Sequence, residues 1–442
     1  MVKTILVLFV YIFTTILTHG TLSQKCFENS EQIHCKLGSK TPYRFIANYN
    51  DSRYIYTGCS EKKMWLVVRH GTRYPGKKHV KPMIKKLPKL KKKIVQSNNQ
   101  NNSELSHDTI EKFNKWTLSF DEKQTMILAN EGENELIDLA ERMQSRFPNI
   151  LVDNYDPELY KFKYTATQRT EKSAQSFVLG LFGQYHSANI TFPKPEQKDP
   201  ILRFYKRCER WRTEIDKNPE TYKEKELFIK SETFQKVVSD ISQRLGLKLD
   251  YESVNLIYLI CAFETAWNKT GKSPWCDTLS LDNMKVLEFM EDLEYYWVDG
   301  YGHQLNYNQA CPALRDMFTF FDSNDKSLVT AYFTHSGTIL KMLSILGIGK
   351  ETNPLTHESF LSHKDRNWKV SLIDAFASNI AFVLYDCKVQ GPSVLVLHQE
   401  RPVQISGCPP EALCPLSIMK KHLPDTEQEC QFDAMCTSSK ET

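Results

Sequence analysis

Several features that mark other classes of protein are scarce or absent here. Across 442 residues the formal net charge is only +4, a small excess that argues against nucleic-acid binding as the main task. None of the twelve cysteines lies in a Cys-x-x-Cys pair, so a zinc ribbon or a thioredoxin-type site has no support. The sequence also lacks metal-ligand spacing, a Gly-x-Ser-x-Gly elbow and a solenoid repeat. We therefore expect no metal and no cofactor.

The N-terminus has the pattern of a secretory signal. Lys3 precedes an apolar run over residues 5–13, and small residues follow near residue 20. We expect residues 1–20 to be a cleaved signal peptide, with an uncleaved anchor as the alternative. No later stretch is apolar and long enough to cross a bilayer, so the processed protein is expected to be secreted or lumenal and to have no membrane span.

The cysteines and glycosylation sequons favour the same compartment. Twelve cysteines are typical of chains that fold under oxidising conditions. Two close pairs, Cys408/Cys414 and Cys430/Cys436, are each able to close a small loop. Four Asn-x-Ser/Thr sequons are candidates for glycosylation, at Asn50, Asn101, Asn189 and Asn268.

An apolar, β-prone run followed by polar residues and then a helical pattern occurs three times. This alternation predicts an α/β fold with a mainly parallel sheet flanked by helices. Ligands bind outside the carboxyl ends of such strands, so His70, Arg169 and His335, which follow the three runs, are expected to converge. The runs are residues 64–68, 162–167 and 328–333.

The rest of the chain completes the predicted layout. Residues 380–385 and 394–397 flank a turn and predict a hairpin at the edge of the sheet. Helical periodicity dominates between 201 and 320, which predicts an inserted α-helical cap subdomain. The discontinuous α/β domain would then comprise residues 21–200 and 321–442.

The segment Arg69-His70-Gly71-Thr72-Arg73 is suited to phosphate chemistry. Arginine neutralises phosphate oxygens with a planar fork of donors and keeps its charge, while a neutral imidazole can attack phosphorus. Two arginines beside a histidine at a strand end are costly near a core unless they bind an anion. The residues alone therefore predict an anion site.

This segment, continued by Tyr74-Pro75, resembles the R-H-G-x-R-x-P signature of the histidine acid phosphatases. The resemblance implies that His70 is the nucleophile that forms a phosphohistidine and that Arg69 and Arg73 bind phosphate. The stretch around Arg169 resembles the family's further arginine. His335 matches its late histidine and would also bind phosphate.

Within the family, the chain most resembles the multiple inositol polyphosphate phosphatases. The similarity includes residues 130–136 and 300–307, before the first long helix and within the helical insertion. It implies a phosphomonoesterase whose partners are small phosphate monoesters: inositol hexakisphosphate, lower inositol phosphates and bisphosphoglycerate. A non-specific acid phosphatase is the alternative.

One departure from the family concerns the proton donor. The family's late histidine is followed by a carboxylic acid, as His-Asp or His-Ala-Glu, whereas this chain has His335-Ser336-Gly337. Another acid such as Asp325 or Glu400, a bound water, or the substrate's own phosphate would have to supply the proton. Otherwise the protein would be a weak enzyme or a phosphate-binding protein.

The segment from 77 to 93 carries nine lysines shortly after the motif. A solvated surface stretch explains them, and so does an electropositive rim that attracts polyanionic substrates. His303 and His398 are expected to be structural or exposed rather than catalytic.

Overall fold

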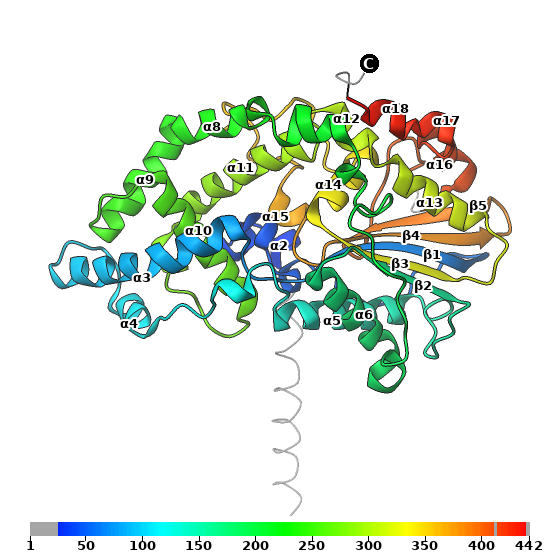
Figure 1. Cartoon of the computed structure of the whole chain (residues 1–442), viewed down its shortest axis with the longest axis horizontal. Helices are drawn as coiled ribbons and strands as arrows, with labels where there is room; N and C mark the ends of the chain where they lie inside the picture. Colours follow the sequence, from blue (N-terminus) through cyan, green and yellow to red (C-terminus); the bar gives the residue numbers. More distant parts are fainter. Residues whose placement is uncertain (1–24, 411–412, 439–442) are drawn as a thin grey trace, which may run out of the picture.

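A seven-stranded sheet forms one end of the molecule, and helices form the other (Figure 1). The computed structural model describes residues 25–410 and 413–438, so the predicted signal peptide lies outside the described residues. The strand order is β2-β3-β1-β4-β5-β6, with β7 paired to β5. The strands are β1 Cys59–Arg69, β2 Tyr160–Tyr164, β3 Val329–Thr334, β4 Asn379–Cys387, β5 Gly391–His398, β6 Arg401–Pro402 and β7 Leu413–Pro415.

The α/β class is confirmed, and the expectation of a mainly parallel sheet is corrected. Parallel pairing is confined to β2, β3 and β1, the three strands that precede the predicted site residues. The strands from β4 onward pair antiparallel. For β4 and β5 the reason is that they form the predicted hairpin, because a short turn joins only antiparallel strands. Because β4 runs opposite to β1, its first residues lie beside the carboxyl end of β1.

Both faces of the sheet are buried. Along β1, Trp65 and Val67 belong to one apolar cluster and Leu66 and Val68 to another, as expected when side chains alternate between faces. Figure 1 shows helices on both sides of the sheet. One side carries α5 Asn130–Arg146 and α6 Gln168–Ser187, and the other carries α13 Cys311–Asp322, α14 Ser336–Ile345 and α16 Leu416–His422.

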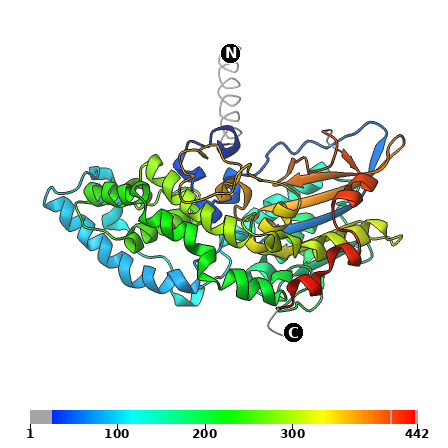
Figure 2. The same ribbon diagram turned by 90° about the horizontal axis from the view of Figure 1, so that it is seen from above.

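A layer of helices extends from the sheet, seen also from above in Figure 2. The lysine-rich segment lies in one of them, α3, which packs against α9 and α10 and continues through Pro82 and Pro88. The lysines therefore lie on the helical part of the molecule, although they follow the motif closely in sequence. These helices are α3 Lys77–Asn99, α4 His107–Lys115, α8 Lys223–Lys230, α9 Glu232–Leu245, α10 Tyr251–Trp267 and α11 Leu281–Val298.

Short helices complete the chain: α2 Lys25–Glu28, α7 Glu209–Trp211, α12 Gln304–Asn308, α15 Val370–Ile373, α17 Glu427–Cys430 and α18 Phe432–Cys436. Within residues 25–410 and 413–438, no helix has the length and apolarity that a bilayer span requires. The limits of the predicted cap, residues 201–320, stay a prediction, and α3 and α4 lie with its helices.

All twelve cysteines form disulfides. The predicted Cys408–Cys414 loop is present. The predicted Cys430–Cys436 loop is wrong, because each cysteine faces a different helix: Cys430 bonds to Cys311 at the start of α13, and Cys436 bonds to Cys208 beside α7. These two bonds attach the C-terminal helices to the body of the protein.

Candidate active site

The three parallel strands end side by side, and each is followed by a predicted site residue. Arg69, the last residue of β1, pairs in register with Thr334, the last residue of β3. The histidines that follow them, His70 and His335, have ring centroids 5.7 Å apart. Arg169 lies in the first turn of α6, just after β2. The expected convergence of these residues is therefore present in the structure.

His70 is held so that one ring nitrogen is free. Its backbone N–H donates to the Thr334 carbonyl at 3.0 Å. Its Nδ1 lies 2.9 Å from the carbonyl oxygen of Gly71. Because a carbonyl only accepts, Nδ1 carries the proton and the lone pair is on Nε2. Burial, followed by the charges of the surrounding arginines, holds the pKa of His70 well below its usual range, so the ring stays neutral in mild acid.

The loop after His70 packs against the start of α5 without room for side chains. A Cβ on Gly71 would lie 2.3 Å from the Gly132 carbonyl oxygen, and a Cβ on Gly132 would lie 2.3 Å from the Thr72 carbonyl oxygen. From the same helix, Glu135 accepts hydrogen bonds from the Thr72 backbone N–H (2.7 Å) and hydroxyl (3.0 Å). Glu135 is thus a positioning residue that sequence reasoning missed.

The two arginines of the motif differ in their partners. Arg69 is buried, lies 3.3 Å from Oδ2 of Asp374, and is stacked over the ring of Phe376. Arg73 donates to the Tyr74 carbonyl at 2.8 Å and has no ion-pair partner among the described residues. Burial and the like charges of neighbouring arginines lower the pKa of Arg73 to about 9. Its charge is therefore available for an anion.

Arg169 and His335 contact each other directly. Nη2 of Arg169 lies 3.1 Å from Nδ1 of His335, and Nε2 of His335 lies 2.9 Å from the Thr165 hydroxyl. Since arginine only donates, Nδ1 accepts and Nε2 carries the proton. Burial first, then nearby arginine charges, lower the pKa of His335 well below its usual value. The ring is accordingly neutral in the absence of an anion.

A further arginine and a carboxyl group reach the site without any motif. The charge of Arg203 lowers the pKa of both Arg169 and His335, so it lies close to them. Nε of Arg203 is buried without a hydrogen-bond partner in the described chain. Asp374 pairs with Arg69 and accepts a hydrogen bond from the Ser336 hydroxyl. Neither residue has a local pattern by which the sequence alone could identify it.

The two acids considered as proton donors are placed elsewhere. Asp325 is exposed, contacts Lys63 and precedes β3, so a strand of about 20 Å separates it from His335. Glu400 is buried and bonded by Arg142 at 2.8 Å and also by Arg146. Burial opposes ionisation of Glu400, but the two arginines outweigh it and lower its pKa. A carboxylate held this way cannot donate a proton in mild acid.

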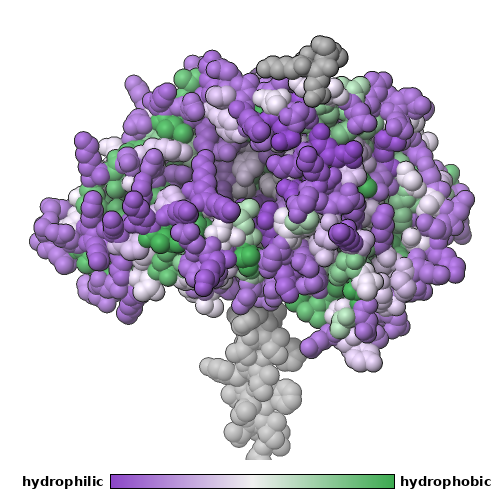
Figure 3. Space-filling view, viewed as in Figure 1, coloured by the Kyte–Doolittle hydropathy of each residue, from purple (hydrophilic) through white to green (hydrophobic). Residues whose placement is uncertain are grey.

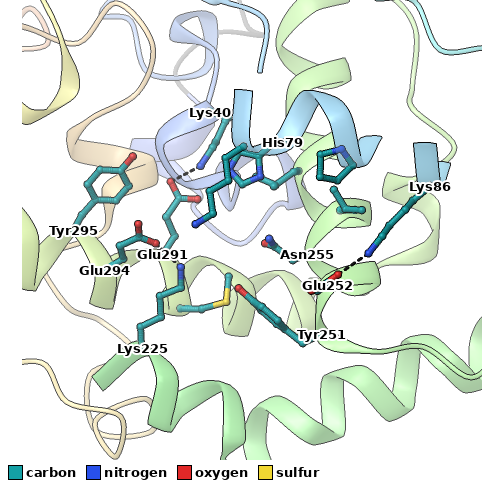
Figure 4. A pocket seen from close by; sticks show the side chains of 15 residues that line it. Lys40, His79, Lys86, Lys225, Tyr251, Glu252, Asn255, Glu291, Glu294 and Tyr295 are labelled. Carbon is teal, nitrogen blue, oxygen red and sulfur yellow. Dashed lines mark hydrogen bonds and ion pairs between the residues drawn. The ribbon is translucent and has the colours of Figure 1, made fainter. Parts of the chain in front are cut away.

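A polar cavity of about 410 Å³ lies among the helices (Figure 4). Lys40 pairs with Glu291 at 2.8 Å, and Lys86 with Glu252 at 2.5 Å. Lys78 lines the cavity and has no ion-pair partner among the residues that the structure describes. Another lining residue, Tyr295, is close enough to Arg73 to raise its pKa. The cavity therefore adjoins the arginine cluster, and Figure 3 shows a hydrophilic face hollowed near its middle.

Comparison with known proteins identifies the family of the chain. Residues 62–401 match the model of the histidine phosphatase superfamily, branch 2. The chain is 31% identical over 411 residues to multiple inositol polyphosphate phosphatase 1 of Drosophila melanogaster, covering 89% of this chain and 86% of that protein. The human protein of the same name is 28% identical over 433 residues, with 90% and 88% covered.

Solved structures share the fold. A multiple inositol polyphosphate phosphatase from Bifidobacterium longum, in complex with inositol hexasulfate, matches with a TM-score of 0.67 at 14% identity, covering 88% of this chain and 98% of that one. The phytase from D. castellii matches with a TM-score of 0.72 at 16% identity, covering 90% and 88%. The family match, the relatives and the arrangement around His70 lead to one conclusion: the chain belongs to branch 2 of the histidine phosphatase superfamily and is a histidine-type phosphoric monoester hydrolase.

Proposed function

We propose that this protein is a secreted phosphatase that removes phosphate from inositol polyphosphates through a phosphohistidine on His70. The observation that carries the proposal is the arrangement of a neutral imidazole, with Nε2 unprotonated, among arginines whose Nε atoms are buried. Within the described chain only Arg69 of these arginines contacts a carboxylate. Unpaired buried cations are costly, and a bound phosphate removes that cost. Six disulfides are in keeping with an oxidising compartment.

In the first step His70 Nε2 attacks phosphorus while Arg69, Arg73 and Arg169 bind the equatorial oxygens. Arginine suits this task because its fixed charges already point to where negative charge develops. Water then attacks the phosphohistidine and releases inorganic phosphate. The depressed pKa of His70 keeps the nucleophile unprotonated in the mildly acidic range, where a normal histidine would be charged.

Arg169 and His335 would change partners when phosphate binds. In the structure Arg169 donates to Nδ1 of His335. A phosphate dianion attracts the guanidinium more strongly than a neutral imidazole does, and it also favours protonation of Nδ1. His335 can then donate that proton in a hydrogen bond to a phosphate oxygen, while Thr165 still orients the ring through Nε2.

The lysine-lined cavity supports a substrate with several phosphates. A phosphate next to the reacting one would meet Lys78, which has no ion-pair partner in the described part of the chain, and then Lys40 and Lys225. The same cavity contains Glu291 and Glu294, which partly neutralise those two lysines. Bisphosphoglycerate and simple phosphate monoesters are further candidate substrates, because they need only the arginine cluster.

The test is phosphate release by the purified protein between about pH 4 and 7.5 from inositol hexakisphosphate, bisphosphoglycerate and 4-nitrophenyl phosphate. We expect multiple turnovers of the first substrate, and loss of turnover by at least about 10³-fold in His70→Ala, because the nucleophile is gone. The matched control is His398→Gln, a buried histidine outside the arginine cluster. A higher kcat/KM on 4-nitrophenyl phosphate than on inositol hexakisphosphate would favour a non-specific acid phosphatase. Tight binding without turnover would favour a phosphate-binding protein.

A further inference from the structure

We propose that Ser336 passes a proton from Asp374 to the leaving oxygen, so that these two side chains replace the single carboxylic acid that follows the late histidine in the family. This inference rests on the proposed function and concerns its first step. It assigns a catalytic role to Ser336, which would touch the substrate, and to Asp374 as the proton source acting through it.

The geometry around Ser336 supports the relay. Ser336 begins α14 directly after His335, is partly exposed, and its hydroxyl is hydrogen-bonded to Oδ2 of Asp374. Asp374 is fully buried, so the substrate can reach it only through another group. Oδ1 of Asp374 is buried and has no hydrogen-bond partner among the described residues. The serine hydroxyl therefore lies between a buried carboxyl group and the site.

Asp374 faces charges from several elements: Arg69 at the end of β1, and Glu291 and Asp299 on or just after α11. Burial, the largest effect, raises its pKa to about 7, although Arg69 and the hydrogen bond from Ser336 act in the opposite direction. Asp374 would thus hold a proton in mild acid. A donor needs that proton in the first step and must be able to recover it in the second.

Asp299 is the competing candidate. A Cβ on Gly337 would lie 3.1 Å from Oδ1 of Asp299, so this carboxylate adjoins the position at which the inositol phosphate branch carries its glutamate. However, Oδ1 of Asp299 is bonded to the ammonium of the buried Lys341. Asp299 is thus held by Lys341, whereas Asp374 contacts the hydroxyl of Ser336, the residue directly after His335. The geometry therefore favours Asp374.

The relay passes one proton in each of the two steps. The bond between His70 Nε2 and phosphorus forms while the ester P–O bond breaks, and its electron pair stays on the leaving oxygen. For the relay, Asp374 is protonated at Oδ2 and donates to Oγ of Ser336, the reverse of the hydrogen bond that its carboxylate accepts. Ser336 then gives its hydroxyl proton to the leaving oxygen, which yields the alcohol, and Asp374 gives its proton to Oγ of Ser336. In the second step the water oxygen forms a bond to phosphorus and its proton passes through Ser336 to Asp374. The N–P bond breaks, its electron pair returns to His70 Nε2, and phosphate leaves.

The experiment compares kcat/KM of Ser336→Ala on two esters with different leaving groups. The leaving group of inositol hexakisphosphate is an alkoxide, which needs a proton, whereas the leaving group of 4-nitrophenyl phosphate is a stabilised phenolate. We expect a loss of about 10²-fold on the first ester and a loss at least about tenfold smaller on the second. Ser336→Asp, which creates the family's His-Asp pair, should recover activity on inositol hexakisphosphate even when combined with Asp374→Asn.

Two variants serve as controls. Ser344→Ala removes a hydroxyl from the same helix and should keep the parent rates, since within the described chain that hydroxyl bonds only to the Leu340 carbonyl. Asp299→Asn should show no dependence on the leaving group. Equal losses on both esters in Ser336→Ala, or a loss specific to the alkoxide in Asp299→Asn alone, would overturn the relay. A parent enzyme that hydrolyses none of the esters would overturn the proposed function, and the relay with it.

Discussion

At the scale of single residues, burial determines the chemistry of the ionisable groups more than the sequence neighbours do. His70 and His398 are both buried and both have a lowered pKa. Only His70 lies among arginines at the end of a parallel strand, whereas Nε2 of His398 lies 2.9 Å from the carbonyl oxygen of Ile373. The first is suited to catalysis, and the second to structure.

The titration of His398 predicts a loss of stability in acid. Burial lowers its pKa to about 4, whereas an unfolded histidine titrates near about 6.5. The unfolded state therefore binds a proton first as the pH falls from about 6.5 to 4, and the free energy of unfolding decreases by about 3 kcal/mol across that window. Urea unfolding at pH 7 and pH 4 should give a smaller difference for His398→Gln than for the parent. An equal difference in both proteins would contradict the prediction.

At the scale of elements, the contact between α5 and the loop after His70 explains how His70 is held. The loop cannot move toward the helix, because Gly71 and Gly132 already meet backbone to backbone. Glu135, on the same helix, accepts a hydrogen bond from the Thr72 amide and so opposes movement of the loop away from the helix. The start of α5 is therefore part of the active site, although none of its side chains is predicted to touch substrate.

Gly132→Ala tests this contact. Alanine alone favours a helix by about 1 kcal/mol over glycine, but the new Cβ would lie 2.3 Å from the Thr72 carbonyl oxygen, a backbone atom that cannot rotate away. We expect a net destabilisation of about 1–3 kcal/mol and a fall in kcat of at least about tenfold. Gly76→Ala is the control, since its Cβ meets only the flexible Met126 side chain, at 3.2 Å. Parental kcat in Gly132→Ala would show that the loop tolerates displacement.

The helix α3 presents lysines both inside and outside the cavity. Lys78 lines the cavity, and Lys93, near the other end of the same helix, is exposed. If the cavity holds additional phosphates, Lys78→Ala should raise KM for inositol hexakisphosphate about tenfold, with little change for 4-nitrophenyl phosphate. Lys93→Ala should match the parent on both substrates. Equal effects of the two substitutions would instead favour a diffuse attraction by the basic helix.

At the scale of the whole molecule, disulfides join segments that are distant in sequence. The Cys208–Cys436 bond spans 228 residues, and the Cys408–Cys414 bond spans 6. In the chain-entropy model, a longer loop restricts the unfolded state more strongly. The C-terminal helices should therefore depend on the first bond for their attachment.

Replacing both cysteines of a pair with serine tests this dependence. We expect the free energy of unfolding to fall by about 5 kcal/mol without Cys208–Cys436 and by about 2 kcal/mol without Cys408–Cys414. Denaturant unfolding of the otherwise oxidised protein measures both values. A smaller effect of the long-range bond than of the short one would contradict the entropic account.

The sequence by itself determined the motif that proposes His70 as the nucleophile and the arginines as phosphate ligands, and it determined the strands that carry them. The Arg-His-Gly-x-Arg motif is local and can be read directly from the sequence. An apolar, β-prone run identifies a strand without knowledge of its partners, so β1, β3 and the β4–β5 hairpin were predictable. Only the tertiary structure decided the antiparallel half of the sheet, the partners of Cys430 and Cys436, and the positions of Arg203 and Asp374. These depend on contacts between segments far apart in the chain, and such contacts leave no pattern in the sequence around either residue.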